Sequence, residues 1–152
     1  MKNQLLAIAL ILYSVFGVGA FDILDIKPDV TPEVKIIDIE EPSESIAKKS
    51  KEIAALVKDQ NDKIQLGIFN NEFANRINRY DLDTQKINDI YSLAGKLFFK
   101  DAMVGKYKGL AESIKSLFIE ILGEENHKIT KEEQEKTKEN FHGVAWALLC
   151  EE

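Results

Sequence analysis

After Ser43, apolar residues recur at steps of three or four, which is the spacing of an amphipathic helix. Ser43 is a candidate N-cap for the first helix, and the polar sequence KDQND breaks it. Asp83 is a candidate N-cap after the second helix, and Gly123 ends the fourth. The sequence from Thr130 to Glu133 is typical of a capping box that opens the last helix. Five amphipathic helices with no strand between them predict an all-α bundle over residues 43–152. The apolar stripes consist of Ile46, Ile53 and Val57; Ile64, Ile68, Phe73, Ile77 and Tyr80; Ile87, Ile90, Tyr91, Ala94, Leu97 and Phe98; Leu110, Ile114, Leu117, Phe118 and Ile121; and Phe141, Val144, Ala145 and Leu148.

The N-terminal leader, residues 1–20, has a different pattern. Lys2 is followed by a run from Leu5 to Val18 without a charged residue, and small residues precede Phe21. This is the pattern of a secretory signal cleaved between Ala20 and Phe21. The run is slightly shorter than the roughly 20 residues of a spanning helix. A retained membrane anchor stays open as the alternative. Both interpretations predict export of the remainder of the chain, to the periplasm or medium if the leader is cleaved and attached to a membrane or virion if it is not.

Residues 21–42 form an arm that contains all three prolines of the chain, Pro28, Pro32 and Pro42. Proline lacks an amide donor and disfavours helix in the residue before it, so the arm should be extended. Its sequence VKIIDIEEP, residues 34–42, is compatible with one short strand. Two interpretations stay open: an acidic tether, or an arm that contacts a partner or adds to a sheet edge. In the second, the contacts are Ile36, Ile37 and Ile39.

Composition excludes several classes of partner. The net charge is −6, and it becomes −7 without residues 1–20, whose single charged residue is Lys2. A chain this acidic is a poor match for the phosphates of nucleic acid, and for anionic lipid. Cys150 is the single cysteine, so the chain has no disulfide framework and no four-thiolate zinc site. We therefore expect the membrane to be contacted through the leader alone, if it is retained.

No motif for catalysis or for a cofactor stands out. Glu139 and His142 have the spacing of a helical metal-ligand pair, but the second such pair that a di-iron bundle needs is missing. The sequence DLDT, residues 81–84, resembles the start of a calcium loop without its central glycine and closing glutamate. Two histidines, one cysteine and the lack of a nucleophile-elbow motif argue against a hydrolytic triad, and no glycine-rich loop precedes a helix with a lysine. We therefore predict no catalytic residue, no cofactor and no metal.

Several apolar side chains fall outside the predicted stripes. These are Leu66, Phe69, Phe99 and Trp146. Each of them either widens the core or faces a partner. A monomer has little use for so many apolar residues off its core face, so they are predicted contacts with a protein partner or a second copy of the chain. The asparagine-rich sequence NNEFANRINRY, residues 70–80, is either a polar contact surface or a solvated helix face.

The order of these segments resembles small exported proteins encoded by tailed bacteriophages. The resemblance is carried by an exported-type leader, an arm ending in EPSESI, and the sequences IFNNEFANRI, YSLAGKLFF and GVAW. It implies a role in the virion or the host envelope and assigns no active-site residue.

The leading hypothesis is a non-enzymatic exported helical protein that acts by protein–protein interaction. The alternative is a small periplasmic enzyme or ligand-binding bundle with a polar pocket near Asn71, Glu72, Arg76 and Asp89. A factor that disrupts membranes is a third hypothesis, and it requires that the leader be retained. A buried cleft with converging carboxylates would favour the enzyme, and a packed bundle with an apolar surface strip would favour binding.

Overall fold

The helical bundle predicted from the sequence is present. The computed structural model describes residues 7–11, 33–37, 39–77, 83–99 and 106–150. The described helices are α2 (Glu44–Ala54), α3 (Gln60–Arg76), α4 (Thr84–Phe99), α5 (Lys108–Leu122) and α6 (Lys131–Leu149). The all-α prediction is therefore confirmed for the bundle.

The helix ends follow the predicted capping residues at three places. The capping box of α6 is complete, because Thr130 Oγ1 accepts from the Glu133 amide at 3.1 Å and Glu133 Oε1 accepts from the Thr130 amide at 3.0 Å. At the start of α4, Asp83 Oδ1 accepts from the Lys86 amide at 2.8 Å. Gly123 ends α5 with φ 79°, a left-handed conformation that glycine adopts without strain.

The break between α2 and α3, residues 55–59, lies earlier in the chain than the sequence suggested. Ser43 precedes α2, but its side chain makes no capping hydrogen bond. α3 begins at Gln60, inside the KDQND sequence, because Asp59 Oδ1 accepts from the Asp62 amide at 3.0 Å and caps the helix there. Polar residues expected to interrupt the helix therefore form its first turn.

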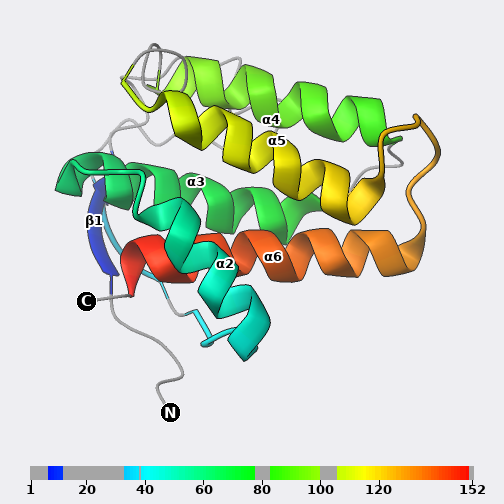
Figure 1. Cartoon of the computed structure of the whole chain (residues 1–152). Helices are drawn as coiled ribbons and strands as arrows, with labels where there is room; N and C mark the ends of the chain where they lie inside the picture. The colour runs from blue at the N-terminus through cyan, green and yellow to red at the C-terminus, as the bar shows by residue number, and fades with distance from the viewer. Residues whose placement is uncertain (1–6, 12–32, 38, 78–82, 100–105, 151–152) are drawn as a thin grey trace.

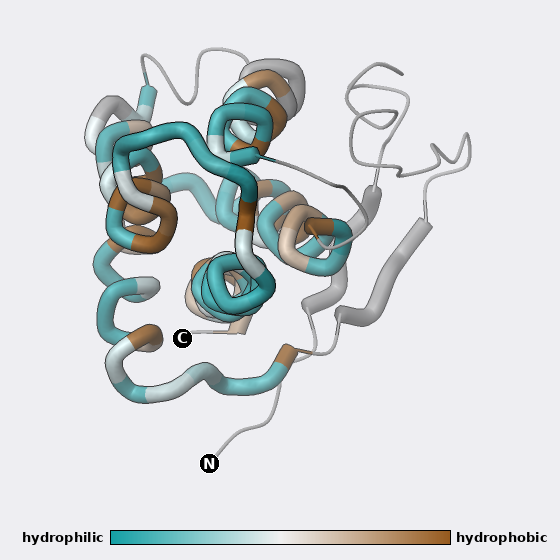
Figure 2. Tube along the Cα trace, turned by 90° about the vertical axis from the view of Figure 1, so that its right-hand side faces the viewer, coloured by the Kyte–Doolittle hydropathy of each residue, from teal (hydrophilic) through white to brown (hydrophobic). Residues whose placement is uncertain are grey.

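Helices α3 to α6 alternate in direction, as in an up-and-down four-helix bundle, and α2 is added to one side (Figure 1). α4 and α5 form one layer, and α3 and α6 form the other, with α2 crossing α6. In the view roughly along the α6 axis, the other helices lie around it (Figure 2). α6 is thus the helix against which most of the bundle packs.

Aromatic side chains from four helices meet at the centre of the bundle. The Phe73 ring of α3 lies 5.0 Å from Tyr91 of α4, and 5.3 Å from Phe141 of α6, measured between ring centroids. Phe118 of α5 lies 4.8 Å from Phe141 and 5.4 Å from Tyr91. All four pairs are tilted or edge-to-face, which suits the aromatic quadrupoles. This aromatic cluster joins the two layers.

Glycine lets α6 approach α2 and α3 closely. A Cβ atom on Gly143 would lie 2.5 Å from Ile46 Cγ2 and 2.8 Å from Ser50 Oγ, and a Cβ atom on Gly67 would lie 2.5 Å from Leu149 Cγ. Larger residues at either position would push the helices apart. The bundle also includes the end of the arm, because Ile39 is buried in the same core.

A two-stranded antiparallel sheet precedes the bundle. β1 (Ala7–Ile11) pairs with β2 (Glu33–Ile37), with Ala7 opposite Ile37 and Ile11 opposite Glu33. The extended conformation predicted for the arm is thus confirmed for residues 33–37, but the strand stops short of the predicted end at Pro42. Its backbone pairs with a segment of the leader, a pairing that the sequence did not predict. The cleavage site between Ala20 and Phe21 lies outside the described residues.

Candidate functional site

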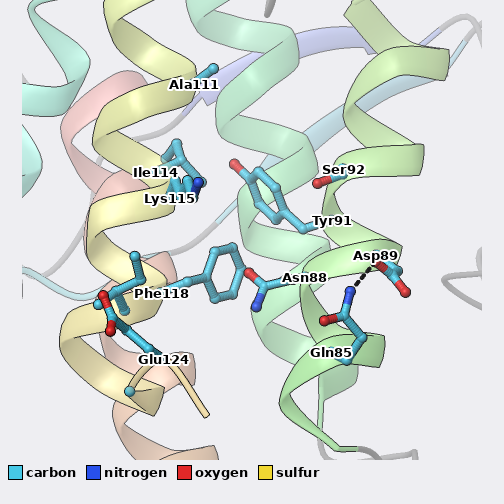
Figure 3. Close-up of a pocket in the computed structure, with 12 residues that line it drawn as sticks. Gln85, Asn88, Asp89, Tyr91, Ser92, Ala111, Ile114, Lys115, Phe118 and Glu124 are labelled. Carbon is cyan, nitrogen blue, oxygen red and sulfur yellow. Dashed lines mark hydrogen bonds between the residues drawn. The ribbon is translucent and has the colours of Figure 1, made fainter. Parts of the chain in front are cut away.

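The candidate site is a groove of about 630 Å³ between α4 and α5 (Figure 3). It lies on the layer that covers α3 and α6, and it opens to solvent. Its lining residues are Gln85, Asn88, Asp89, Tyr91, Ser92, Ala111, Ile114, Lys115, Phe118, Ile119, Gly123 and Glu124.

The floor of the groove is apolar and rigid. Tyr91, Ile114 and Phe118 are 2%, 4% and 3% exposed, and two of them belong to the aromatic cluster. Each is therefore fixed by the core beneath it, while one side of it borders the groove. A ligand that buried apolar groups here would not have to order the floor first, which favours binding.

Tyr91 is anchored by a buried polar contact. Its hydroxyl donates to Asn70 Oδ1 at 2.9 Å, and Asn70 Nδ2 donates to the carbonyl oxygen of Leu66 at 2.8 Å. Burial raises the pKa of Tyr91 far above its ordinary value, although the hydrogen bond to Asn70 acts in the opposite direction. The phenol therefore stays neutral and serves to orient the ring. Asn70 is fully buried, so it cannot belong to the polar surface considered for residues 70–80.

The two rims of the groove differ in chemistry. On the α4 side the rim is polar, and Gln85 Nε2 donates to Asp89 Oδ1 at 2.8 Å (Figure 3). On the α5 side, Ala111 and Ile119 accompany Lys115, and Ile119 is 38% exposed. An amphipathic segment of a partner could place apolar side chains on the floor and polar groups along the α4 rim.

One end of the groove is closed by the loop between α5 and α6. Thr84 Oγ1 donates to Asn126 Oδ1 at 2.9 Å, and the Gln85 amide donates to the same oxygen at 3.0 Å. The Thr84 amide donates to the carbonyl oxygen of His127 at 2.9 Å. Because Gln85 also lines the groove, these bonds fix the edge of the site.

His127 connects this loop to α6. Its Nδ1 lies 2.9 Å from the carbonyl oxygen of Glu125, and its Nε2 lies 2.7 Å from Glu133 Oε2. Both ring nitrogens face acceptors, so the protonated ring with two N–H donors suits the position best. The pKa of His127 is raised, first by the bond to the Glu125 carbonyl and then by Glu133. Burial acts to raise the pKa of Glu133. The hydrogen bonds from Thr130 and His127 act in the opposite direction, and the pKa is lowered.

A second groove, of about 530 Å³, lies on the other side of α5, against α2. Its floor contains Ile53 and Leu117, which are buried, and Leu56, which is half-buried. Charged side chains surround it, and Lys49 pairs there with Glu120. The solvent-exposed face of α5 is therefore a ridge between two grooves.

Some predicted partner contacts are core residues of the chain itself. Leu66 is 3% exposed, Phe69 1%, Trp146 5% and Ile39 4%. This corrects the prediction that these side chains are exposed for a partner. The reason for Leu66 and Phe69 is that α3 is covered on several sides, so its buried face is wider than the predicted stripe. Ile36, Ile37 and Phe99 lie in β2 and α4, and their side chains are outside the described part of the structure.

Trp146 is buried for a related reason. The C-terminal half of α6 lies among the other helices, and every residue from Gly143 to Cys150 is buried. The Lys51 ammonium nitrogen lies 5.5 Å from the Trp146 ring centroid and covers part of its outer side. Cys150 is itself buried.

The residues considered for an enzyme pocket do not share either of the two described grooves. Glu72 pairs with Arg76 one turn along α3, with Nε and Oε2 3.2 Å apart. Asp89 belongs to the α4–α5 groove, and Asn71, Glu72 and Arg76 line neither of the two grooves. His142 Nε2 lies 2.7 Å from Asn75 Oδ1, and burial lowers the pKa of this histidine. Among the described residues, no group of His, Cys, Asp and Glu side chains is arranged to hold a metal ion.

Signals in the sequence pointed to some of these features and missed others. Ile119 lies outside the predicted apolar stripe of its helix and precedes Glu120 on the outer face. The groove itself could not be read from the chain, because it depends on how far apart α4 and α5 pack. The one sign of the groove in the sequence is the small size of the side chains at Ser92 and Ala111, which lie on its facing edges.

Comparison of the chain with protein-family models, curated proteins and solved structures found no match to any of them. The resemblance to bacteriophage proteins therefore stays a prediction. Within the described residues, no helix combines the length and the apolar character that crossing a membrane requires.

Proposed function

We propose that this protein is exported and acts by binding another protein through the α4–α5 groove. The observation that supports the proposal most is the combination of a buried aromatic floor with the exposed Ile119 on its rim. Rigid apolar floors with a polar border are typical of grooves that accept an amphipathic helix. In this role the bundle is a scaffold, and the chain carries out no chemical reaction.

The cellular setting of this role rests on the leader. A signal cleaved after Ala20 would release the bundle to the periplasm or medium, and a retained leader would attach it to the membrane or to a virion. The intact mass of the protein after export distinguishes these, because cleavage removes residues 1–20. We expect the mature chain to begin at Phe21.

The binding role is tested by the size of the complex in extracts of the cells or particles that naturally contain the protein. Ile119→Glu places a charge on the groove rim without disturbing the core, so we expect it to convert a larger complex into free chain. Leu93→Glu is the matched control, because Leu93 is 45% exposed on α4 and does not line the groove. A complex that survives Ile119→Glu would contradict the proposal.

A small-molecule site is the second candidate function. The volume of about 630 Å³ falls within the range of roughly 300–1,000 Å³ that such sites occupy. Asp89 and Lys115 supply opposite charges on the two rims. Native mass spectrometry of the protein from its natural source would reveal a retained ligand, and Ser92→Trp, which fills the groove, should abolish it.

A further inference from the structure

We propose that the α2–α5 groove binds a basic amphipathic helix of a partner protein. This surface is separate from the α4–α5 groove and lies on the opposite side of α5. The proposal rests on three features of the α2–α5 groove: the charge of its rims, the apolar floor and the small residues of its α5 wall.

The rims carry more negative than positive charge. Glu52 lies on the α2 side, and Glu112 and Glu120 lie on the α5 side. Lys49 is the single cation of the lining and is already paired with Glu120. Glu52 and Glu112 are both exposed, and neither forms an ion pair with any side chain that the structure describes. Two carboxylates on opposite rims are thus available to cations of an incoming segment.

The floor and wall suit a helix rather than a small cation. Ile53 and Leu117 are buried in the floor of the groove, and Leu56 is half-buried there. The α5 wall presents Gly109, Ser113 and Ser116, which recur at steps of four and three and so lie along one side of the helix. Side chains this small allow a second helix to approach α5 closely. An apolar stripe would cover Leu56, and flanking Lys or Arg residues would reach Glu52 and Glu112.

The charge of the whole chain favours the same kind of partner. A net charge of −6 attracts a basic segment and repels a second copy of this chain. Self-association through this groove would place carboxylates against carboxylates. The charge complementarity therefore favours a basic partner over a homodimer at this site.

The test uses the purified full chain and a synthetic helical peptide of about 18 residues, or five turns, with a leucine stripe and lysine at the remaining positions. A matched peptide carries glutamate in place of every lysine. We expect the lysine peptide to bind and Glu52→Lys/Glu112→Lys to weaken it by about tenfold or more. The same variant should bind the glutamate peptide better than the wild type does.

The control is Glu135→Lys/Glu139→Lys, which changes the net charge equally on the exposed side of α6. Binding that this control weakens as much would show a non-specific charge effect and overturn the proposal. Failure of the lysine peptide to bind the wild type would also overturn it. Ile119→Glu, in the other groove, should leave peptide binding unchanged, so failure here is distinct from failure of the proposed function.

Discussion

The C-terminal half of α6 and the α4–α5 pair use apolar residues in opposite ways. In α6, every residue from Gly143 to Cys150 is buried, and glycine brings the neighbouring helices close to it. In the α4–α5 pair, buried aromatic residues form the floor of a groove that opens to solvent. The first region contributes stability and leaves no surface for a ligand. The α4–α5 pair is less completely packed, and the groove that results can bind a ligand.

The largest expected difference between these regions concerns two phenylalanines of the aromatic cluster. Phe141→Ala removes a ring that is 0% exposed and should lower the free energy of unfolding by about 4–5 kcal/mol, because it leaves a closed cavity. Phe118→Ala removes a ring beside the groove, where the lost space joins an open one, and should cost about 3 kcal/mol. Urea unfolding of both variants measures the difference. Equal losses would contradict the comparison.

The close approach of α2 to α6 predicts the next effect. Gly143→Val should destabilise the fold by about 1–3 kcal/mol, because its side chain would overlap Ile46 and Ser50. Gly109→Ala is the matched control on α5, where the nearest atom lies 3.8 Å from the new Cβ. This substitution should stabilise by up to about 1 kcal/mol through helix propensity. Thermal unfolding of the two variants measures both effects, a decrease in stability for Gly143→Val and an increase for Gly109→Ala.

The buried contact beneath the groove should have an effect of similar size. Tyr91→Phe leaves Asn70 Oδ1 without its donor and should cost about 1–3 kcal/mol. The double variant Tyr91→Phe/Asn70→Leu removes both polar groups, and we expect it to be less unstable than the sum of the single variants. Strictly additive losses would mean that the hydrogen bond contributes little.

The smallest effect is the pH dependence of the contact between His127 and Glu133 near the end of the groove. Because the pKa of His127 is raised, its contribution to stability is complete below about 6.5 and is lost as pH rises through the folded-state pKa. Because the pKa of Glu133 is lowered, its contribution to stability is lost as pH falls through its folded-state pKa. The stability difference between the wild type and His127→Gln should therefore be largest between about pH 4.5 and 6.5. A stability difference between these two proteins that grows above pH 8 would contradict a stabilising contact between His127 and Glu133.

Periodicity and capping residues were enough to predict the helices, and packing decided the rest. Thr130, Asp83 and Gly123 act within one turn of the chain, so their roles follow from local sequence. The buried face of α3 depends on which helices cover it. Leu66, Phe69 and Asn70 were misplaced for this reason, since a stripe gives one face and α3 has neighbours on several.

Trp146 and the groove show two further limits of sequence. The run GVAWALLC is apolar on every side, and such a run has no periodicity from which a face could be chosen. The α4–α5 groove arises from the separation of two helices, which depends on contacts between residues distant in sequence. The sequence places Asp89 near Arg76 in a polar pocket, and the structure places it on the groove rim.

Site-specific photo-crosslinking from position 119 tests the central claim most directly. A photoreactive residue in place of Ile119 lies on the groove rim, and one in place of Leu93 lies on α4 outside the groove lining. We predict that irradiation in the natural setting joins position 119 to one protein of defined mass, and that position 93 gives no such product. Equal products from both positions, or none from position 119, would contradict the assignment of the α4–α5 groove as a protein-binding site.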